Sequence, residues 1–383
     1  MVDMNKVLSL HEKNIGVLKI DGTFNVNNRN DLAEAYTPGV ADLAKRIEKK
    51  PELKERYTIS GKLVAIISDG SAVLGLGNVG PAASLPIIEG KALLYKNFAN
   101  VNVIPLALEQ SSVDDIVKTI KTIAPSFAGI HLEDIAAPKV FEIEERLSKE
   151  LVIPVYHDDQ TGTAIVVLAG LINAAKVVNK PLKDLQVVIN GIGAAGVATA
   201  KILIAAGLKN LTLVDIEGVV KSDNPTYNDY QRKLVANIQQ ATGAELDDVI
   251  DNQDVFIGLS VANVLNKHQV ARMSAKPIIF ALANPIPEIN PKEALEVGAG
   301  VVATGSSQWP NQVNNILAFP GLFKGLLASG LKHVDLQLQI EVANALADMV
   351  AKPTATKIVP GVFDESVVNN VAQAVLNYAK NKL

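Results

Sequence analysis

The sequence predicts an α/β protein of two domains, each built around a mainly parallel β-sheet. Short apolar segments alternate with helix-like segments in a strand–helix–strand order, which is typical of parallel sheets covered by helices. The alternation pauses at a polar stretch, NKPLKD at 179–184, and then starts again. Only 4% of residues are aromatic while 48% are hydrophobic, so small aliphatic side chains would fill the core. We predict domains at 1–160 and 161–383.

The first domain shows three strand–helix repeats and a fourth strand. Ser112 stands where an N-cap is expected, and Pro138 lies near the start of a helix, where proline is tolerated. The expected strands are 62–68, 101–108, 128–132 and 153–159, and the expected helices are 81–99, 112–124 and 138–151.

The second domain follows a long apolar helix, expected near 161–178. Its apolar run at 163–178 is shorter than the roughly 20 residues that a membrane span needs, so we interpret it as a buried core helix. A helical tail is expected at 335–350 and 364–381. The remaining predicted elements are strands 185–191, 211–216, 254–260, 276–283 and 299–305 and a helix at 194–206.

Composition narrows the possible functions and partners. The chain has 36 basic and 40 acidic residues and no basic stripe, which argues against nucleic acid as a partner. It has no cysteine, which excludes disulfides, thiol catalysis and thiolate metal sites and agrees with a reducing compartment. The polar N-terminus lacks the apolar region of a signal peptide. We therefore expect a cytoplasmic protein with a small-molecule ligand and no membrane partner.

A glycine-rich turn, GIGAAG at 191–196, lies between a predicted strand and a predicted helix. Gly191, Gly193 and Gly196 would permit a tight turn and close approach of a pyrophosphate, with Ala194 and Ala195 opening the helix. The next strand ends in Asp215, 24 residues after the first glycine (215 − 191), where an acid binds the adenosine ribose. Ile216 and Glu217 offer no cation for a 2′-phosphate, so NAD is favoured over NADP. The alternative is a purely structural turn.

A second glycine pattern, GLGNVG at 75–80, does not directly follow its strand and is followed by proline. No ribose-binding acid follows it at the usual distance. Two interpretations stay open: a backbone-rich loop that lines a site for an anionic substrate, and a structural turn.

Paired acids end two of the predicted strands. Glu133 and Asp134 follow one strand, and Asp158 and Asp159 follow the next, so all four would meet at the carboxyl edge of the sheet. Oxygen ligands of this kind suit Mg²⁺ or Mn²⁺. Spacing alone is equally compatible with solvated acids at helix N-termini.

Two histidines precede the paired acids, and both lie on the predicted strands. His131 and His157 stand two residues before Glu133 and Asp159, so each would share a strand face with an acid. A histidine-containing zinc site is a weaker alternative to histidines that only hydrogen-bond the acids.

The order of these motifs resembles that of malic enzymes, in the short bacterial form. The shared segments are AEAYTPGVA (33–41), GLGNVG, EGKALLY (89–95), HLEDI, HDDQTGTA, GIGAAG, FALANPIPE (280–288) and NNILAFPG (314–321). The resemblance covers nearly the whole chain. It implies a substrate- and metal-binding domain followed by a Rossmann-like NAD-binding domain, and oxidative decarboxylation of (S)-malate to pyruvate and CO₂ with NAD(P) and Mn²⁺ or Mg²⁺.

The resemblance also implies roles for individual residues. Glu133, Asp134 and Asp159 would be the metal ligands. Lys91 would be the general base, Tyr36 the general acid, and Asp158 the carboxylate beside the lysine. Asn284 and Asn315 would be amides near the substrate and the nicotinamide. One position departs from the longer family members, which carry a substrate-gripping arginine before GLG. Here Ser71 and Ala72 stand instead.

In the chemistry that the resemblance implies, Lys91 must be neutral to take the hydroxyl proton. Burial beside a cation would lower the pKa of Lys91, and Asp158 would raise it. Tyr36 would then protonate C3. Related activities stay open, namely oxaloacetate decarboxylation and conversion of malate to lactate, as does a non-catalytic metabolite-binding role. A homodimer is expected, with the tyrosine loop reaching a site in the partner subunit.

Overall fold

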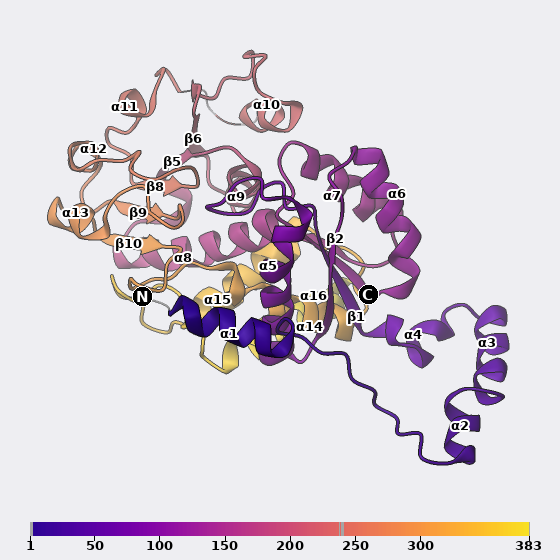
Figure 1. Ribbon diagram of the computed structural model, residues 1–383. Coiled ribbons are helices and arrows are strands. Elements are labelled where there is room, and N and C mark those ends of the chain that lie inside the picture. The colour runs from indigo at the N-terminus through magenta and orange to yellow at the C-terminus, as the bar shows by residue number, and fades with distance from the viewer. Residues whose placement is uncertain (1–2, 237, 239–240, 383) are drawn as a thin grey trace.

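The computed structural model of the chain describes residues 3–236, 238 and 241–382 and contains two β-sheets (Figure 1). The first sheet is parallel and has the strand order β2-β1-β3-β4. The second has the order β10-β9-β8-β5-β6-β7 and is parallel except for β7, which pairs antiparallel with β6. The predicted α/β class with two sheets is confirmed.

The strands are short and mostly buried. Those of the first sheet are β1 (Leu63–Ser68), β2 (Asn102–Ala107), β3 (Gly129–Glu133) and β4 (Val155–His157). Those of the second are β5 (Gln186–Asn190), β6 (Asn210–Asp215), β7 (Gly218–Val219), β8 (Val255–Gly258), β9 (Ile278–Ala281) and β10 (Val301–Thr304). Every residue of β1, β3, β8 and β9 is buried, because helices cover both faces of each sheet.

Three helices connect the strands of the first sheet: α5 (Gly80–Leu94), α6 (Val113–Ile123) and α7 (Lys139–Glu150). The Ser112 side chain accepts a hydrogen bond from the Asp115 N–H and so caps α6 as predicted. The predicted strand at 153–159 is shorter than expected. It stops at His157, and Asp158–Gly162 form a turn of π-helix that places the second acid pair on a helical segment.

The long apolar helix α8 (Thr163–Val177) continues directly from that π-helical turn. The combined helix Asp158–Val177 is 20 residues long, so by length and composition alone it could cross a membrane, contrary to our estimate from the sequence. However, 78% of its apolar window is buried inside the protein. It packs mainly against α9 (Ala194–Ala205) and α15 (Leu336–Asp348), which confirms a core helix.

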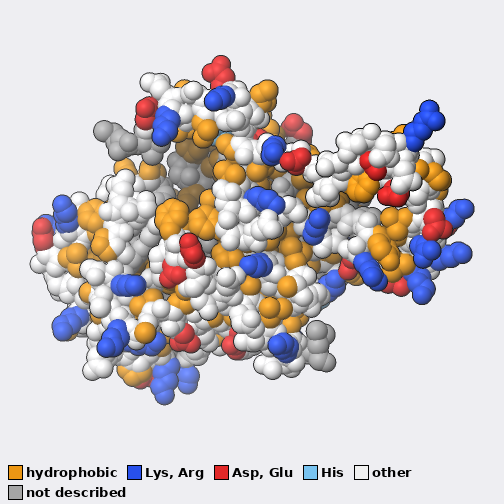
Figure 2. Space-filling model, turned by 90° about the horizontal axis from the view of Figure 1, so that it is seen from below, with side chains coloured by type: hydrophobic (Ala, Val, Ile, Leu, Met, Phe, Trp, Pro, Cys, Tyr) orange, Lys and Arg blue, Asp and Glu red, His pale blue; other side chains and the backbone are white. Residues whose placement is uncertain are grey.

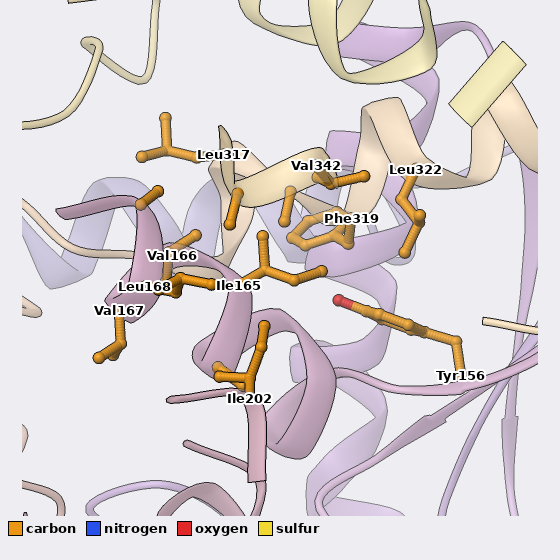
Figure 3. Packing of buried hydrophobic residues seen from close by; sticks show 14 of the residues in the cluster. Tyr156, Ile165, Val166, Val167, Leu168, Ile202, Leu317, Phe319, Leu322 and Val342 are labelled. Atoms are coloured by element: carbon orange, nitrogen blue, oxygen red, sulfur yellow. The ribbon is translucent and has the colours of Figure 1, made fainter. Parts of the chain in front are cut away.

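The C-terminal helices return to the first sheet. Helix α14 (Phe319–Ser329) packs against α16 (Ser366–Lys382), and Phe319 and Phe323 of α14 contact Tyr95, which precedes β2. Figure 3 shows Phe319 and Ile165 of α8 packed in the same cluster as Tyr156 of β4. One continuous core therefore joins residues of both sheets. The smaller helices at the rim of the second sheet are α10 (Asp229–Val235), α11 (Leu246–Val249), α12 (Lys267–Arg272) and α13 (Pro291–Glu296).

Four N-terminal helices were not predicted from the sequence: α1 (Met4–Asn14), α2 (Arg29–Ala35), α3 (Gly39–Lys49) and α4 (Leu53–Tyr57). None of them contains a buried residue. Helices α2 and α3 project away from the body of the molecule (Figure 1), and we call residues 28–57 the arm. Figure 2 shows apolar side chains exposed on this projection among lysines and acids.

Candidate active site

The acids that end β3 and β4 converge at the carboxyl edge of the first sheet. Ligand oxygens of Glu133, Asp134 and Asp159 all lie within 4.8 Å of one another. Asp134 adopts a left-handed backbone conformation with φ 53°, and its N–H donates to Asp159 Oδ2 over 3.0 Å. Glu133 and Asp134 are buried, and Asp159 is partly exposed. The two acid pairs therefore form one cluster with an opening to solvent at Asp159.

The electrostatics of this cluster suit a divalent cation. Burial raises the pKa of Glu133 to about 7 and that of Asp134 to about 8, and the neighbouring carboxylates add to the rise for Asp134. Burial also opposes ionisation of Asp159, but His157, whose Nε2 lies 3.2 Å from Asp159 Oδ2, lowers the pKa of Asp159 to about 2. The buried Oδ2 of Asp134 has no hydrogen-bond partner among the described residues. Three oxygen donors and an unsatisfied carboxylate oxygen are suited to Mg²⁺ or Mn²⁺.

Lys91 lies in the last turn of α5 and points at the same acids. Its Nζ donates to Asp158 Oδ2 over 2.6 Å and to Glu133, and its side chain is 13% exposed. Burial disfavours the charged amine, but the carboxylates of Asp158 and Glu133 outweigh burial and raise the pKa of Lys91. This shift is opposite to the depression expected for a lysine beside a bound cation. The Nζ also lies 5.3 Å from the centre of the Phe319 ring.

Buried aromatic and histidine side chains hold the acids in place. His131 Nε2 lies 2.6 Å from Glu133, and its Nδ1 lies 2.7 Å from the Tyr95 hydroxyl. Burial lowers the pKa of His131 to about 3, so the ring is neutral; Nε2 donates to Glu133 and Nδ1 accepts from Tyr95. On the other side, the Tyr156 hydroxyl donates to Asp158.

The sequence predicted the two histidine–acid pairs but not the tyrosines. His131 and Glu133 share a face of β3, because side chains alternate along a strand. Asp159 lies beyond the end of β4, on the π-helical turn, and reaches His157 from there. The alternating positions could also have indicated Tyr156, two residues before Asp158. No sequence signal links Tyr95 to His131, since 36 residues separate them.

The zinc alternative rests on a second group of potential ligands: His131, Glu133 and Asp158. Lys91 already bridges Glu133 and Asp158 in this group. Both ring nitrogens of His131 are also engaged, Nε2 with Glu133 and Nδ1 with the Tyr95 hydroxyl, so neither is free to bind a metal. The geometry therefore favours histidine as a hydrogen-bonding neighbour of the acids.

The first glycine pattern lies in the connection between β1 and α5. Gly75, Gly77 and Gly80 all have positive φ, between 75° and 78°. A side chain at Gly75 would approach the Asn284 carbonyl to 3.0 Å, so this loop reaches the second domain. The Ala72 N–H donates to the Asp134 carbonyl over 3.0 Å. The segment from Ala72 to Gly75 thus contacts both the backbone of Asp134 and the backbone of Asn284.

Ser71 occupies the position where longer family members carry arginine. Its Oγ accepts from the Ala136 N–H over 2.9 Å and donates to buried Asp69 over 2.5 Å. Lys139 Nζ lies 2.6 Å from the other oxygen of Asp69. The Ser71 hydroxyl therefore already hydrogen-bonds its neighbours, and Lys139, the cation in this network, is paired with Asp69.

The second glycine pattern joins β5 to α9. Gly191 has φ 103°, and a side chain at Gly196 would lie 1.9 Å from the Gly191 carbonyl oxygen. Helix α9 begins without a side-chain cap, which leaves its first N–H groups available to a phosphate. Asp215 ends β6, the strand paired with β5, so it lies beside this turn as predicted.

The remaining predicted residues lie in two different places. Asn284 follows β9 and faces the Gly75 loop, while Asn315 packs against Gly162 at the start of α8, where an added side chain would come within 3.0 Å of its Cβ. Tyr36 is 67% exposed at the end of α2 on the projecting arm. Helix α2, which ends at Tyr36, projects away from α5, which carries Lys91 (Figure 1).

The second domain has a glycine turn followed by an acid at a strand end, and the first has a cluster of carboxylates beside a buried lysine. These features define the class as a two-domain dinucleotide-binding enzyme. A family model described as the malic enzyme N-terminal domain matches residues 22–112 and 109–148. A second, described as the malic enzyme NAD-binding domain, matches residues 160–380. The chain belongs to the malic enzyme family, and the sequence-based resemblance is confirmed.

Individual relatives agree with this assignment. The bifunctional malic/malolactic enzyme of Bacillus subtilis is 47% identical over 98% of this chain and 92% of its own length. The NAD-dependent malic enzyme of Geobacillus stearothermophilus is 46% identical over 95% of this chain and 77% of its own. The crystal structure of the NAD-dependent malic enzyme of Thermotoga maritima is 43% identical and superposes with a TM-score of 0.94, covering 98% of this chain and 99% of that one.

Proposed function

We propose that this protein oxidises and decarboxylates (S)-malate to pyruvate and CO₂, with NAD⁺ as the hydride acceptor. The observation that carries the proposal is Lys91, buried between Asp158 and Glu133 beside a cluster of three carboxylates. Nearly full-length relatives at 46–47% identity are named malic enzymes. Such a reaction needs a base, a divalent cation and a bound dinucleotide. The amine of Lys91 would be the base, the carboxylate cluster would bind the cation, and the glycine turn would bind the dinucleotide.

Glu133, Asp134 and Asp159 would hold Mn²⁺ or Mg²⁺. When bound, the ion would supply Lewis-acid polarisation of the substrate's C1 carboxylate and C2 oxygen. Asp159 lies on the solvent-facing side of the cluster, and His157 keeps it ionised at neutral pH. His131 donates to Glu133 and fixes the orientation of that carboxylate.

Lys91 is proposed to take the C2 hydroxyl proton while hydride leaves C2 for the nicotinamide, which requires a bound cation to lower the pKa that Asp158 and Glu133 raise. Asp158, held by the Tyr156 hydroxyl, orients the amine. Loss of CO₂ from the resulting β-keto acid leaves an enolate. Tyr36 would donate a proton to C3 of that enolate, and Lys91 would return its proton to the tyrosine. Asn315 and Asn284 are proposed to bind substrate and nicotinamide from the second domain.

The arm supports a homodimer in which Tyr36 completes the site of the partner subunit. Helices α2, α3 and α4 bury no residue, and Leu32, Tyr36 and Val40 expose their side chains. Apolar side chains in helices without a core are stabilised by packing against another surface. A second copy of this chain both covers the arm and needs the tyrosine.

NAD is proposed over NADP because Asp215 and Glu217 place negative charge where a 2′-phosphate would bind. The two separate sheets, with strands at 63–157 and 186–304, support 1–160 as the substrate- and metal-binding domain and 161–383 as the NAD-binding domain with its helical tail. The absence of cysteine supports a cytoplasmic location.

Two measurements test the proposal. Purified protein with (S)-malate, NAD⁺ and Mn²⁺ should produce NADH, followed at 340 nm, together with an equal amount of pyruvate, and EDTA should abolish both.

A second candidate, conversion of malate to lactate and CO₂ with retained NAD, is favoured by the malic/malolactic name of the B. subtilis relative. Lactate formed without free NADH would select that candidate. Loss of oxaloacetate above the metal-only rate, with no malate turnover, would select a decarboxylase.

A further inference from the structure

Glu288 is a buried carboxylate in the second domain to which the proposed reaction gives no role. Its exposed fraction is 0%. Its Oε2 accepts a hydrogen bond from the Ala283 N–H over 3.0 Å, and its Oε1 accepts one from the Ser260 N–H over 3.2 Å. Ala283 lies in the loop after β9, and Ser260 lies in the loop after β8. One side chain therefore ties together two loops at the carboxyl edge of the second sheet.

No salt bridge reaches Glu288 among the described residues. Burial raises its pKa, and the N–H groups of Ala283 and Ser260 oppose the rise. A buried carboxylate without a cation destabilises a fold relative to a well-packed apolar side chain. Its presence points to a role that depends on two hydrogen-bond acceptors at this place.

The tied loops reach the dinucleotide turn. The Asn190 side chain donates to Ser260 Oγ over 2.8 Å, and Asn190 immediately precedes Gly191. A side chain at Gly191 would lie 2.5 Å from the Leu259 carbonyl oxygen, so the β5 and β8 loops are in close contact. Through Ser260, Glu288 is connected to the segment that would bind the pyrophosphate.

The tied loops also reach the first domain. Asn284 directly follows Ala283, and its carbonyl lies against Gly75 in the connection between β1 and α5. Gly258 leaves room for the glutamate, since a side chain there would lie 2.3 Å from the Glu288 Cδ. A movement of Glu288 would therefore shift Asn284 relative to the acid cluster.

We propose that Glu288 is a positioning residue that holds the β8 and β9 loops so that Asn284 contacts the nicotinamide half of the dinucleotide. This inference rests on the proposed function, because it assigns the carboxyl edge of the second sheet to NAD. Hydride transfer depends on alignment of the reacting atoms, and small displacements reduce its rate strongly.

The test compares Glu288→Gln with Asp254→Asn. Glutamine keeps the volume of glutamate but turns an NH₂ donor toward one of the two N–H groups. Asp254 is the control for loss of a carboxylate at the opposite edge of the same sheet, where it accepts the Gln186 N–H over 2.9 Å and pairs with Lys180. Glu288→Gln should raise KM for NAD⁺ by about tenfold or more and lower kcat, while Mn²⁺ affinity and KM for malate stay within about twofold. Asp254→Asn should leave KM for NAD⁺ within about twofold.

Direct binding separates a positioning role from general loosening of the domain. Glu288→Gln should weaken binding of NADH, followed by its fluorescence, more strongly than that of ADP-ribose, which keeps the pyrophosphate but lacks the nicotinamide ring. Equal loss of both ligands, or a KM for NAD⁺ no higher than in Asp254→Asn, would overturn the inference. If Glu288→Gln does not fold, Glu288→Asp, which cannot reach both N–H groups, carries the same expectations. If the wild type binds NADH but does not turn over malate, the proposed function fails. The changes in NADH affinity and in ADP-ribose affinity on Glu288→Gln, each relative to the wild type, still test the role of Glu288.

Discussion

The Nζ of Lys91 lies 2.6 Å from the Oδ2 of Asp158, and neither group has open access to solvent. Lys91 comes from the end of α5 and Asp158 from the π-helical turn after β4, so two separate connections of the first sheet build the pair. Glu133 holds the same amine from β3. Two carboxylates with different proposed roles therefore hold the lysine. Asp158 would orient the amine, and Glu133, which belongs to the carboxylate cluster, would bind a cation.

Replacing Lys91 with alanine should lower kcat for malate oxidation by about 10²–10⁴-fold, the range expected for a removed general base. Steady-state kinetics with saturating malate and NAD⁺ measure it. NADH affinity should not change, because Lys91 lies in the first domain. Lys96→Ala is the matched control, since Lys96 is exposed and bonds only Asn100 and Asn102 among the described residues. A kcat within tenfold of the wild type would remove Lys91 from the general-base role.

Metal affinity should rise with pH between about 6 and 8. The pKa of Glu133 is about 7 and that of Asp134 about 8, and a cation binds only the ionised carboxylates, so binding releases protons below these values. Isothermal titration with Mn²⁺ in buffers of different ionisation enthalpy measures both the affinity and the protons released.

The same two carboxyls set the sign of a stability change. Each has a higher pKa in the folded chain than its ordinary value of 4.5 or 3.8, so the folded state binds more protons and loses stability as pH rises toward 8. Mn²⁺ should reverse this loss, and the increase in Tm on adding Mn²⁺ should be larger at pH 8 than at pH 6. In Asp134→Asn the pH dependence should weaken. An equal Tm increase at both pH values would contradict the raised pKa values of Glu133 and Asp134.

The sequence predicted the sheets well because their strands are apolar runs between polar turns. Strands β1 and β3 lie within one or two residues of the expected ranges. The acid cluster was predictable for the same reason, since polar residues that end neighbouring parallel strands meet at one edge. The predicted strand at 153–159 was too long because Asp158 and Asp159 begin a helical turn whose continuation is α8.

What the sequence did not predict depends on contacts between distant segments. Tyr95, His131 and Phe319 meet only when α14 packs on the first sheet. Helices α1–α4 bury no residue within the chain, so a prediction based on apolar faces that pack on a core does not include them. The exposure of Tyr36 likewise follows from the path of the arm and from no local pattern.

Replacing Asp215 with alanine should reduce the preference for NAD⁺. The carboxylate is expected to accept hydrogen bonds from the ribose and to repel a 2′-phosphate, so its loss should lower kcat/KM for NAD⁺ by about 10- to 100-fold and affect NADP⁺ less. Initial rates with both nucleotides give the ratio. Glu217→Gln, two residues further on, is the control for charge alone. A wild type that prefers NADP⁺ would refute the assignment before any variant is made.

Mixing two inactive variants should restore activity if the arm completes the site of the partner subunit. In Tyr36→Phe protein every site lacks the tyrosine hydroxyl, and in Lys91→Ala protein every site lacks the amine. A mixed dimer with exchanged arms has one site with both changes and one with neither. Random mixing makes half of the dimers mixed, so activity should recover to about a quarter of the wild-type value.

The experiment requires proof that mixed dimers form. The two variants should be unfolded and refolded together, or expressed together with different affinity tags, and the doubly tagged species isolated. That species should reach about half of the wild-type activity, because one of its two sites is intact. A control mixture of Lys91→Ala with Asp158→Asn should stay inactive, because these two residues meet within one subunit and every site of the mixed dimer then carries one change. Doubly tagged Tyr36→Phe/Lys91→Ala dimers without activity would place the tyrosine and the lysine in the same subunit.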